Sequence, residues 1–159
     1  MSADVAIMMG SKSDLPIMEE ATEILRDFSV SFEIKVLSAH RTPKETCSFA
    51  EQFRSKGGKV FICAAGMSAA LSGVVAAHTT LPVIGVPIDS SSLQGLDALL
   101  STVQMPPGVP VGAVAIGKPG AKNAALLAIR IMSLADASLE KKLAAFADEQ
   151  RKKILDSNG

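Results

Sequence analysis

The sequence predicts an α/β fold, in which a parallel sheet of five strands is covered by helices on both faces. Two observations carry this prediction. Short apolar runs alternate about five times with segments of helical periodicity, which is typical of parallel sheets buried on both faces. The chain has 159 residues, of which 48% are hydrophobic, and this is enough to bury one core. We therefore expect a flavodoxin-like three-layer αβα sandwich with the strand order 2-1-3-4-5.

The strands are expected where a short apolar run is bounded by glycine, proline or other turn-forming residues. The sequence contains such runs at 5–9, 32–37, 60–64, 82–86 and 111–116.

The helices are expected between these runs and after the last one, where apolar residues recur at spacings of three and four. Pro16 suits the first turn of the first helix, which Asp14 or Ser13 can cap. The expected helices are 15–28, 43–56, 69–78, 93–103, 121–134 and an amphipathic terminal helix at about 138–156. No linker separates them, so the sequence predicts a single catalytic domain over 1–159 with a core over about 1–134.

The composition excludes several classes of protein. The formal net charge is zero, so no basic field favours nucleic acid or an anionic membrane as partner. No apolar stretch reaches the ~20 residues of a membrane-spanning helix, and we expect no signal peptide. Cys47 and Cys63 lack metal-ligand spacing, so both are expected in the core of a cytoplasmic protein. The many alanine, glycine and methionine residues favour association of the chain with copies of itself.

Three unusual segments follow the first three predicted strands. In the order 2-1-3-4-5 these strands are neighbours, and ligands in such folds bind beyond the carboxyl ends of the strands. Segments 10–14, 38–43 and 65–73 are therefore expected to converge on one crevice.

The first segment, Gly10-Ser11-Lys12-Ser13-Asp14, precedes a predicted helix. Serine hydroxyls, backbone amides and a helix N-terminus favour a phosphate group, and Asp14 can accept hydrogen bonds from ribose hydroxyls. A capped turn with Lys12 in water would explain the same residues.

The second segment, 38–43, places Ser38, His40 and Arg41 at the end of a strand. Arg41 can hold a phosphate or carboxylate with two parallel hydrogen bonds. Imidazole is the side chain that normally exchanges protons near neutral pH, so His40 is the candidate general acid/base. A polar loop in which His40 merely caps a helix is the alternative. His78, the second histidine, is expected near the end of a helix without a catalytic role.

The third segment, 65–73, has almost no charge. Its small residues can line a tight and partly apolar pocket, or they can simply allow a helix to pack closely against its neighbour. Three other activities of this general fold fit less well. There is no Trp or Tyr to stack a flavin, no aspartate after the third strand to accept a phosphoryl group, and no G-x-G-x-x-G after the first strand.

Four motifs, in order and with matching spacing, resemble one known family over nearly the whole chain. It is the phosphoribosylaminoimidazole carboxylase catalytic subunit family of purine biosynthesis (PurE type), which includes the N5-carboxyaminoimidazole ribonucleotide mutases. The motifs are Met9-Gly10-Ser11-Lys12-Ser13-Asp14, Ser38-Ala39-His40-Arg41-Thr42-Pro43, Val103-Gln104-Met105-Pro106 with Gly108-Val109-Pro110-Val111, and Lys122-Asn123-Ala124-Ala125-Leu126-Leu127-Ala128.

The resemblance implies a cytoplasmic homo-octamer whose sites lie at subunit interfaces, with the terminal helix reaching neighbouring subunits. It implies that His40 is the acid/base and that no metal, biotin or ATP takes part. The carbamate of the nucleotide substrate would be lost as CO2, held in the pocket, and added at C4 of the imidazole. The substrate-binding residues implied by the resemblance or by the crevice are Ser11, Ser13, Asp14, Ser38, Arg41, Gly66, Met67, Ser68, Ala70 and Leu71.

The third segment departs from the mutase pattern. The bacterial mutases carry Gly-Gly-Ala-Ala-His-Leu-Pro-Gly there, so that Met67 replaces a glycine, Ala70 the histidine and Ser72 the proline. This stretch looks more like the direct aminoimidazole ribonucleotide carboxylases. Two alternatives to a mutase therefore stay open, a direct carboxylase that uses CO2 and a repurposed, non-catalytic nucleotide-binding protein.

Overall fold

The computed structural model describes residues 3–157, so the ends of the predicted domain at 1 and 159 lie outside the described residues. Its parallel sheet has the order β2-β1-β3-β4-β5, which confirms the predicted topology. The strands are β1 (Val5–Met9), β2 (Phe32–Val36), β3 (Val60–Gly66), β4 (Val83–Ile88) and β5 (Gly112–Ala113).

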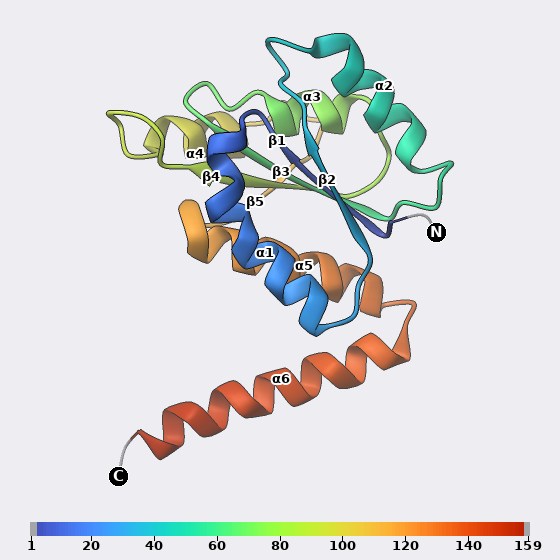
Figure 1. Cartoon of the computed structure of the whole chain (residues 1–159), viewed down its shortest axis with the longest axis vertical. Coiled ribbons are helices and arrows are strands. Elements are labelled where there is room, and N and C mark those ends of the chain that lie inside the picture. The colour runs from blue at the N-terminus through green and yellow to red at the C-terminus, as the bar shows by residue number, and fades with distance from the viewer. Residues whose placement is uncertain (1–2, 158–159) are drawn as a thin grey trace.

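Helices cover both faces of the sheet, as expected. In Figure 1, α1 and α5 lie on one face, and α2, α3 and α4 lie on the other. The helices are α1 (Leu15–Asp27), α2 (Pro43–Phe53), α3 (Leu71–Ala77), α4 (Leu96–Val103), α5 (Gly117–Ser133) and α6 (Ala137–Asp156), and a short 3₁₀ turn, η1 (Lys12–Asp14), precedes α1.

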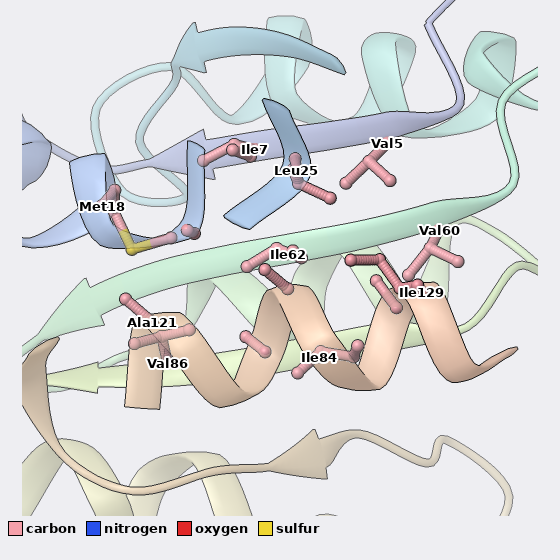
Figure 2. Close-up of a cluster of buried hydrophobic side chains, with 14 of the residues drawn as sticks. Val5, Ile7, Met18, Leu25, Val60, Ile62, Ile84, Val86, Ala121 and Ile129 are labelled. Carbon is pink, nitrogen blue, oxygen red and sulfur yellow. The ribbon is translucent and has the colours of Figure 1, made fainter. Parts of the chain in front are cut away.

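The larger core cluster lies between the sheet and the pair α1 and α5. Figure 2 shows aliphatic side chains of β1, β3 and β4 facing side chains of these two helices. The helix α5 can approach the sheet closely because its buried face carries fully buried alanines, Ala121, Ala124, Ala125 and Ala128. Alternate residues of β1, such as Ala6 and Met8, point to the second cluster under α2 and α3.

Several element boundaries differ from the sequence prediction. The helix α5 begins at Gly117 instead of 121, and β3 and β4 each run two residues further than expected, to Gly66 and Ile88. The edge strand β5 pairs through Gly112 and Ala113 alone, instead of over 111–116. The helix α4 begins at Leu96 rather than 93, because Gln94 and Gly95 have φ angles of 51° and 83°, which no right-handed helix contains. The helix α2 ends at Phe53 rather than 56. The chain then turns back over Phe53, whose ring fills the space where a side chain at Gly58 would lie.

The first half of the terminal helix α6 packs against the body of the chain. Asp136 caps it, since Oδ1 accepts hydrogen bonds from the backbone N of Ser138 at 2.9 Å and of Leu139 at 3.3 Å. The rings of Phe146 and Phe28 meet edge to face at 5.8 Å. The second half points away from the rest of the chain (Figure 1).

The two cysteines differ in burial. Cys63 on β3 is buried, as predicted, and burial raises the pKa of its thiol. Cys47 is only half-buried, so its assignment to the core was wrong. The helix α2 buries the face that carries Thr46, Ala50 and Phe53, and Cys47 lies beside that face. Among the described residues, no helix is both long and apolar enough to cross a membrane.

Candidate active site

One cleft of about 580 Å³ gathers all the predicted site residues. Their roles remain predictions, but the structure brings the three segments together as expected. The lining residues are Gly10, Ser11, Ser13, Asp14, Ser38, Ala39, His40, Arg41, Ala65, Gly66, Met67, Ser68, Ala69, Ala70, Leu71 and Ser90.

The register of the sheet explains this convergence. Met9, the last residue of β1, lies opposite Val36 of β2 and Ala64 of β3. The strand β3 continues two residues further, to Gly66. Because the three strands are parallel, the loops that follow them emerge at the same edge of the sheet.

The first loop is held by its own hydroxyl groups. Ser11 caps η1, and its Oγ accepts a hydrogen bond from the backbone N of Ser13 at 3.3 Å. The hydroxyl of Ser13 lies 2.8 Å from Ser11 Oγ and 3.2 Å from Asp14 Oδ1. Asp14 occupies the N-cap position of α1, as expected, but its side chain makes no capping hydrogen bond to the helix.

Asp14 is instead a nearly buried carboxyl group in the cleft, with an exposed fraction of 6%. Burial raises the pKa of this carboxyl, whereas hydrogen bonds with Ser13 and Ser11 and the positive charge of Arg41 act in the opposite direction. An acceptor in such a position can bind a hydroxyl group of a ligand without competition from water.

The second loop is tied to the first by Arg41. Its Nη2 donates a hydrogen bond to the carbonyl oxygen of Gly10 at 2.6 Å, and its Nε donates to Ser38 Oγ at 3.4 Å. Ser38 Oγ also accepts from the backbone N of Arg41 at 3.2 Å. The guanidinium group is therefore already oriented toward the serine loop.

His40 is exposed at the cleft. No hydrogen bond joins its ring to another residue within 3–157. The other histidine, His78, ends α3 as predicted, and its Nδ1 lies 2.9 Å from Glu51 Oε1 on the surface. The two rings thus differ in the way that matters for proton exchange, because only His40 faces a cleft.

The third loop is made of small residues, with one exception. Met67 has a φ angle of 56° and an exposed fraction of 62%. A side chain at the neighbouring Gly66 would overlap the hydroxyl of Ser90, which would have to turn aside.

Ser90 is the lining residue that the sequence analysis missed. It follows β4, whose carboxyl end lies at the same edge of the sheet as the other loops. The one signal in the sequence was its position after a strand. Ser90 is followed by Ser91 and Ser92, so its residue type did not distinguish it from its neighbours.

Comparison with known proteins gives the family. A sequence model of the family described as AIR carboxylase matches residues 4–153. The chain belongs to the AIR carboxylase family. This finding confirms the resemblance on which the site residues were chosen.

Several relatives of known name are similar to this AIR carboxylase family member over nearly all of its length. The N5-carboxyaminoimidazole ribonucleotide mutase of Haemophilus influenzae is 49% identical over 156 residues, which cover 98% of this chain and 95% of the relative. The mutase of Saccharolobus solfataricus is 52% identical over 151 residues, which cover 95% and 94%.

Solved structures agree with the fold. Treponema denticola PurE has a TM-score of 0.88 at 33% identity and covers 97% of this chain and 95% of its own. A substituted form of PurE2 from the same organism has a TM-score of 0.90 at 32% identity, and covers 99% and 97%.

The cleft of this AIR carboxylase family member has two chemically different sides. Hydroxyl groups, a buried carboxyl and an oriented guanidinium form one side, which suits a phosphorylated sugar. Small apolar residues form the other, and His40 belongs to the same cleft. The arrangement can hold an anionic ligand and exchange a proton with it.

Proposed function

We propose that this chain is an N5-carboxyaminoimidazole ribonucleotide mutase of purine biosynthesis, an isomerase. The observation that carries the proposal is His40, whose ring is unpartnered among residues 3–157 in a cleft with one anion-binding side and one apolar side. The names of relatives that are about half identical support the same reaction.

The polar side of the cleft binds the ribose phosphate in this proposal. Ser11, Ser13 and Arg41 donate hydrogen bonds to the phosphate, and Asp14 accepts hydrogen bonds from the ribose hydroxyls. Ser38 holds the guanidinium of Arg41 through its Oγ.

His40 acts as both acid and base. The bond between N5 and the carboxyl carbon breaks, its electron pair stays on N5, and N5 takes a proton from His40 while CO2 forms. C4 of the imidazole then attacks the CO2, and the proton from C4 returns to His40. No proton or electron is gained or lost overall, so the scheme balances with His40 as the proton carrier and needs no oxidant or reductant.

The apolar side holds the CO2 between the two steps. Gly66, Met67, Ser68, Ala70 and Leu71 line this part of the cleft. CO2 has no charge, and therefore it is retained by enclosure and exclusion of water rather than by an ion pair.

The test is a comparison of two substrates. The purified protein is given either the N5-carboxylated nucleotide, or aminoimidazole ribonucleotide with saturating bicarbonate, and the 4-carboxylated product is measured. We expect faster product formation from the N5-carboxylated nucleotide. Product from the unmodified nucleotide alone would make the protein a direct carboxylase, and no product from either would mean a repurposed site.

The direct carboxylase has less support. The departures at Met67, Ala70 and Ser72 suggested it, but the relatives described above are mutases by name.

We also propose that the protein works as a homo-oligomer, with an octamer as the expected state. The chain exposes 8656 Å², against ~7,600 Å² for a compact monomer of its mass. Leu96, Leu100 and Val103 lie on one face of α4 and are exposed by 53%, 50% and 51%. The second half of α6 exposes Ile154 and Leu155 by 69% and 53%, and we propose that this surface packs on neighbouring subunits.

Sedimentation velocity tests the assembly. We expect the mass of eight chains for the wild type and smaller species for Leu100→Glu. Ser48→Glu, on the exposed side of α2, is the matched control and is expected to keep the wild-type mass. A wild-type monomer would contradict the proposal.

A cytoplasmic location is proposed on the two free cysteines, which suit a reducing compartment.

A further inference from the structure

Met67 combines two unfavourable properties in one residue. Its φ angle of 56° lies in the left-handed region. Among the described residues other than glycine, Ser29 and Gln94 are the only others with a positive φ angle. In the single chain Met67 is 62% exposed, so no other part of the described chain covers its large apolar group. A glycine at this position would avoid both costs.

The surroundings make the methionine more unusual. The other residues of 65–70 are alanine, glycine and serine. Met67 is thus the one long side chain between the end of β3 and the start of α3. It also lines the cleft with His40 and Ser90. A strained and exposed residue that lines a cleft points to a role in binding a ligand there.

Methionine suits a surface that must adapt to a ligand. Its unbranched side chain has three rotatable bonds and a polarisable sulfur, so that it can fold over an aromatic ring or a small apolar molecule. The charged groups of the cleft, Asp14 and Arg41, come from the loops after β1 and β2. Met67 supplies apolar surface from the loop after β3.

We propose that Met67 is the cover of the apolar side of the cleft, which closes over the carboxyl group of the bound nucleotide and keeps the released CO2 beside the imidazole. This inference rests on the proposed mutase reaction and adds to it a residue that prevents loss of the intermediate. Neutral CO2 offers no strong hydrogen bond, so a flexible apolar side chain can retain it where a charged group would not.

The experiment measures how often CO2 escapes. Wild type, Met67→Gly and Met67→Leu are given the N5-carboxylated nucleotide in ¹³C-bicarbonate with carbonic anhydrase, so that dissolved CO2 is labelled. We record the labelled fraction of the product and the aminoimidazole ribonucleotide released per product formed. For Met67→Gly we expect both to rise and kcat/KM to fall, the latter by roughly tenfold, the size typical of a lost apolar contact in a pocket. Met67→Leu should stay near the wild type.

A stability measurement separates a cover from a structural residue. Met67→Gly is expected to melt at the same or a higher temperature than the wild type, because glycine relieves the left-handed strain. Ser29→Gly is the matched control, since Ser29 has a φ angle of 59° in the turn after α1. It should show a similar thermal effect with unchanged label uptake and product yield.

The outcomes are distinct. A Met67→Gly protein with wild-type label uptake and release of the unmodified nucleotide would overturn the cover. A lower melting temperature for Met67→Gly would also count against it, because the side chain would then stabilise the unliganded chain. Failure of the wild type to convert the N5-carboxylated nucleotide would instead overturn the proposed reaction, and that result is visible before any variant is compared.

Discussion

The two sides of the cleft are built on different physical principles. On the polar side, hydrogen bonds of 2.6–3.4 Å join Ser13 to Ser11, and join Arg41 to Ser38 and to the carbonyl oxygen of Gly10. On the apolar side, small residues and one strained methionine provide shape without side-chain hydrogen bonds between themselves. A charged sugar phosphate can be recognised by preset partners, whereas a neutral gas can only be enclosed.

Removal of the His40 imidazole should give the largest loss of activity, because it removes the acid/base and leaves the groups on both sides of the cleft in place. We expect His40→Asn to lower kcat by about 10²–10⁴-fold and to leave the affinity for the nucleotide nearly unchanged, measured by steady-state kinetics and calorimetry. His78→Asn changes the only other imidazole, which pairs with Glu51 on the surface, and should keep wild-type kcat. Turnover near wild type in His40→Asn would contradict the assignment of the acid/base.

Loss of the guanidinium should affect the polar side alone. Arg41→Ala is expected to raise KM by roughly 10- to 100-fold, the value of one or two hydrogen bonds to a charged group, with a smaller change in kcat. Arg41→Lys keeps the charge and loses the second hydrogen bond, so its KM should lie between those of the wild type and Arg41→Ala. A large fall in kcat at unchanged KM would place Arg41 near the reacting atoms instead.

A methyl group at Gly66 should disturb the apolar side through its shape. A side chain there would overlap Ser90 Oγ, so we expect Gly66→Ala to reduce kcat/KM by roughly tenfold and to lower the melting temperature by about 2–4 °C. The second variant, Gly66→Ala with Ser90→Gly, removes the clash and should recover most of both losses. Equal losses in the single and double variants would show that the contact with Ser90 is not the cause.

The smallest effect should come from Asp14→Asn on the polar side, where we expect a gain in the thermal stability of the protein. Folding raises the pKa of Asp14 above the 3.8 of an exposed aspartate. The folded chain is therefore more stable with the Asp14 carboxyl protonated than with it ionised. The free energy of unfolding therefore falls as pH rises above about 3.8. Asp14→Asn should raise the melting temperature at pH 7, and this gain should shrink toward pH 4.

The same substitution should weaken nucleotide binding, because Asn offers fewer acceptor sites for ribose hydroxyls. Thermal melting across pH 4–8 with and without nucleotide checks both expectations. A lower melting temperature for Asp14→Asn at pH 7 would mean that the carboxylate stabilises the free protein.

The polar side was easier to predict from sequence than the apolar side. Serine, histidine and arginine after a strand suggest chemistry by themselves, and the sheet order then places Ser11, His40 and Arg41 together. Small residues such as Gly66 carry no such signal, because their value depends on a neighbour that only the fold supplies. Ser90 was missed for this reason, since its contact with Gly66 joins two different strands.

Local backbone geometry limited the prediction of the elements. Buried strands such as β1 and β3 follow from continuous apolar runs, and the proline and glycine signals placed α1 and α2 nearly correctly. The start of α4 was wrong because the apolar spacing continues into Leu93, whereas Gln94 and Gly95 take left-handed conformations. The short β5 was overestimated because the same apolar run can leave the sheet after two paired residues.

The brevity of β5 bears on aggregation. A sheet edge exposes unpaired backbone groups that can recruit a strand from another molecule. At one edge, β5 offers two residues, which is too short a template for a stable added strand. At the other, β2 carries Glu33 and Lys35, whose side chains form an ion pair of 3.2 Å, and charged groups on an edge strand oppose such pairing. Both edges of the sheet are thus protected, so the chain can present its long apolar strands β3 and β4 in the centre without becoming prone to form fibres.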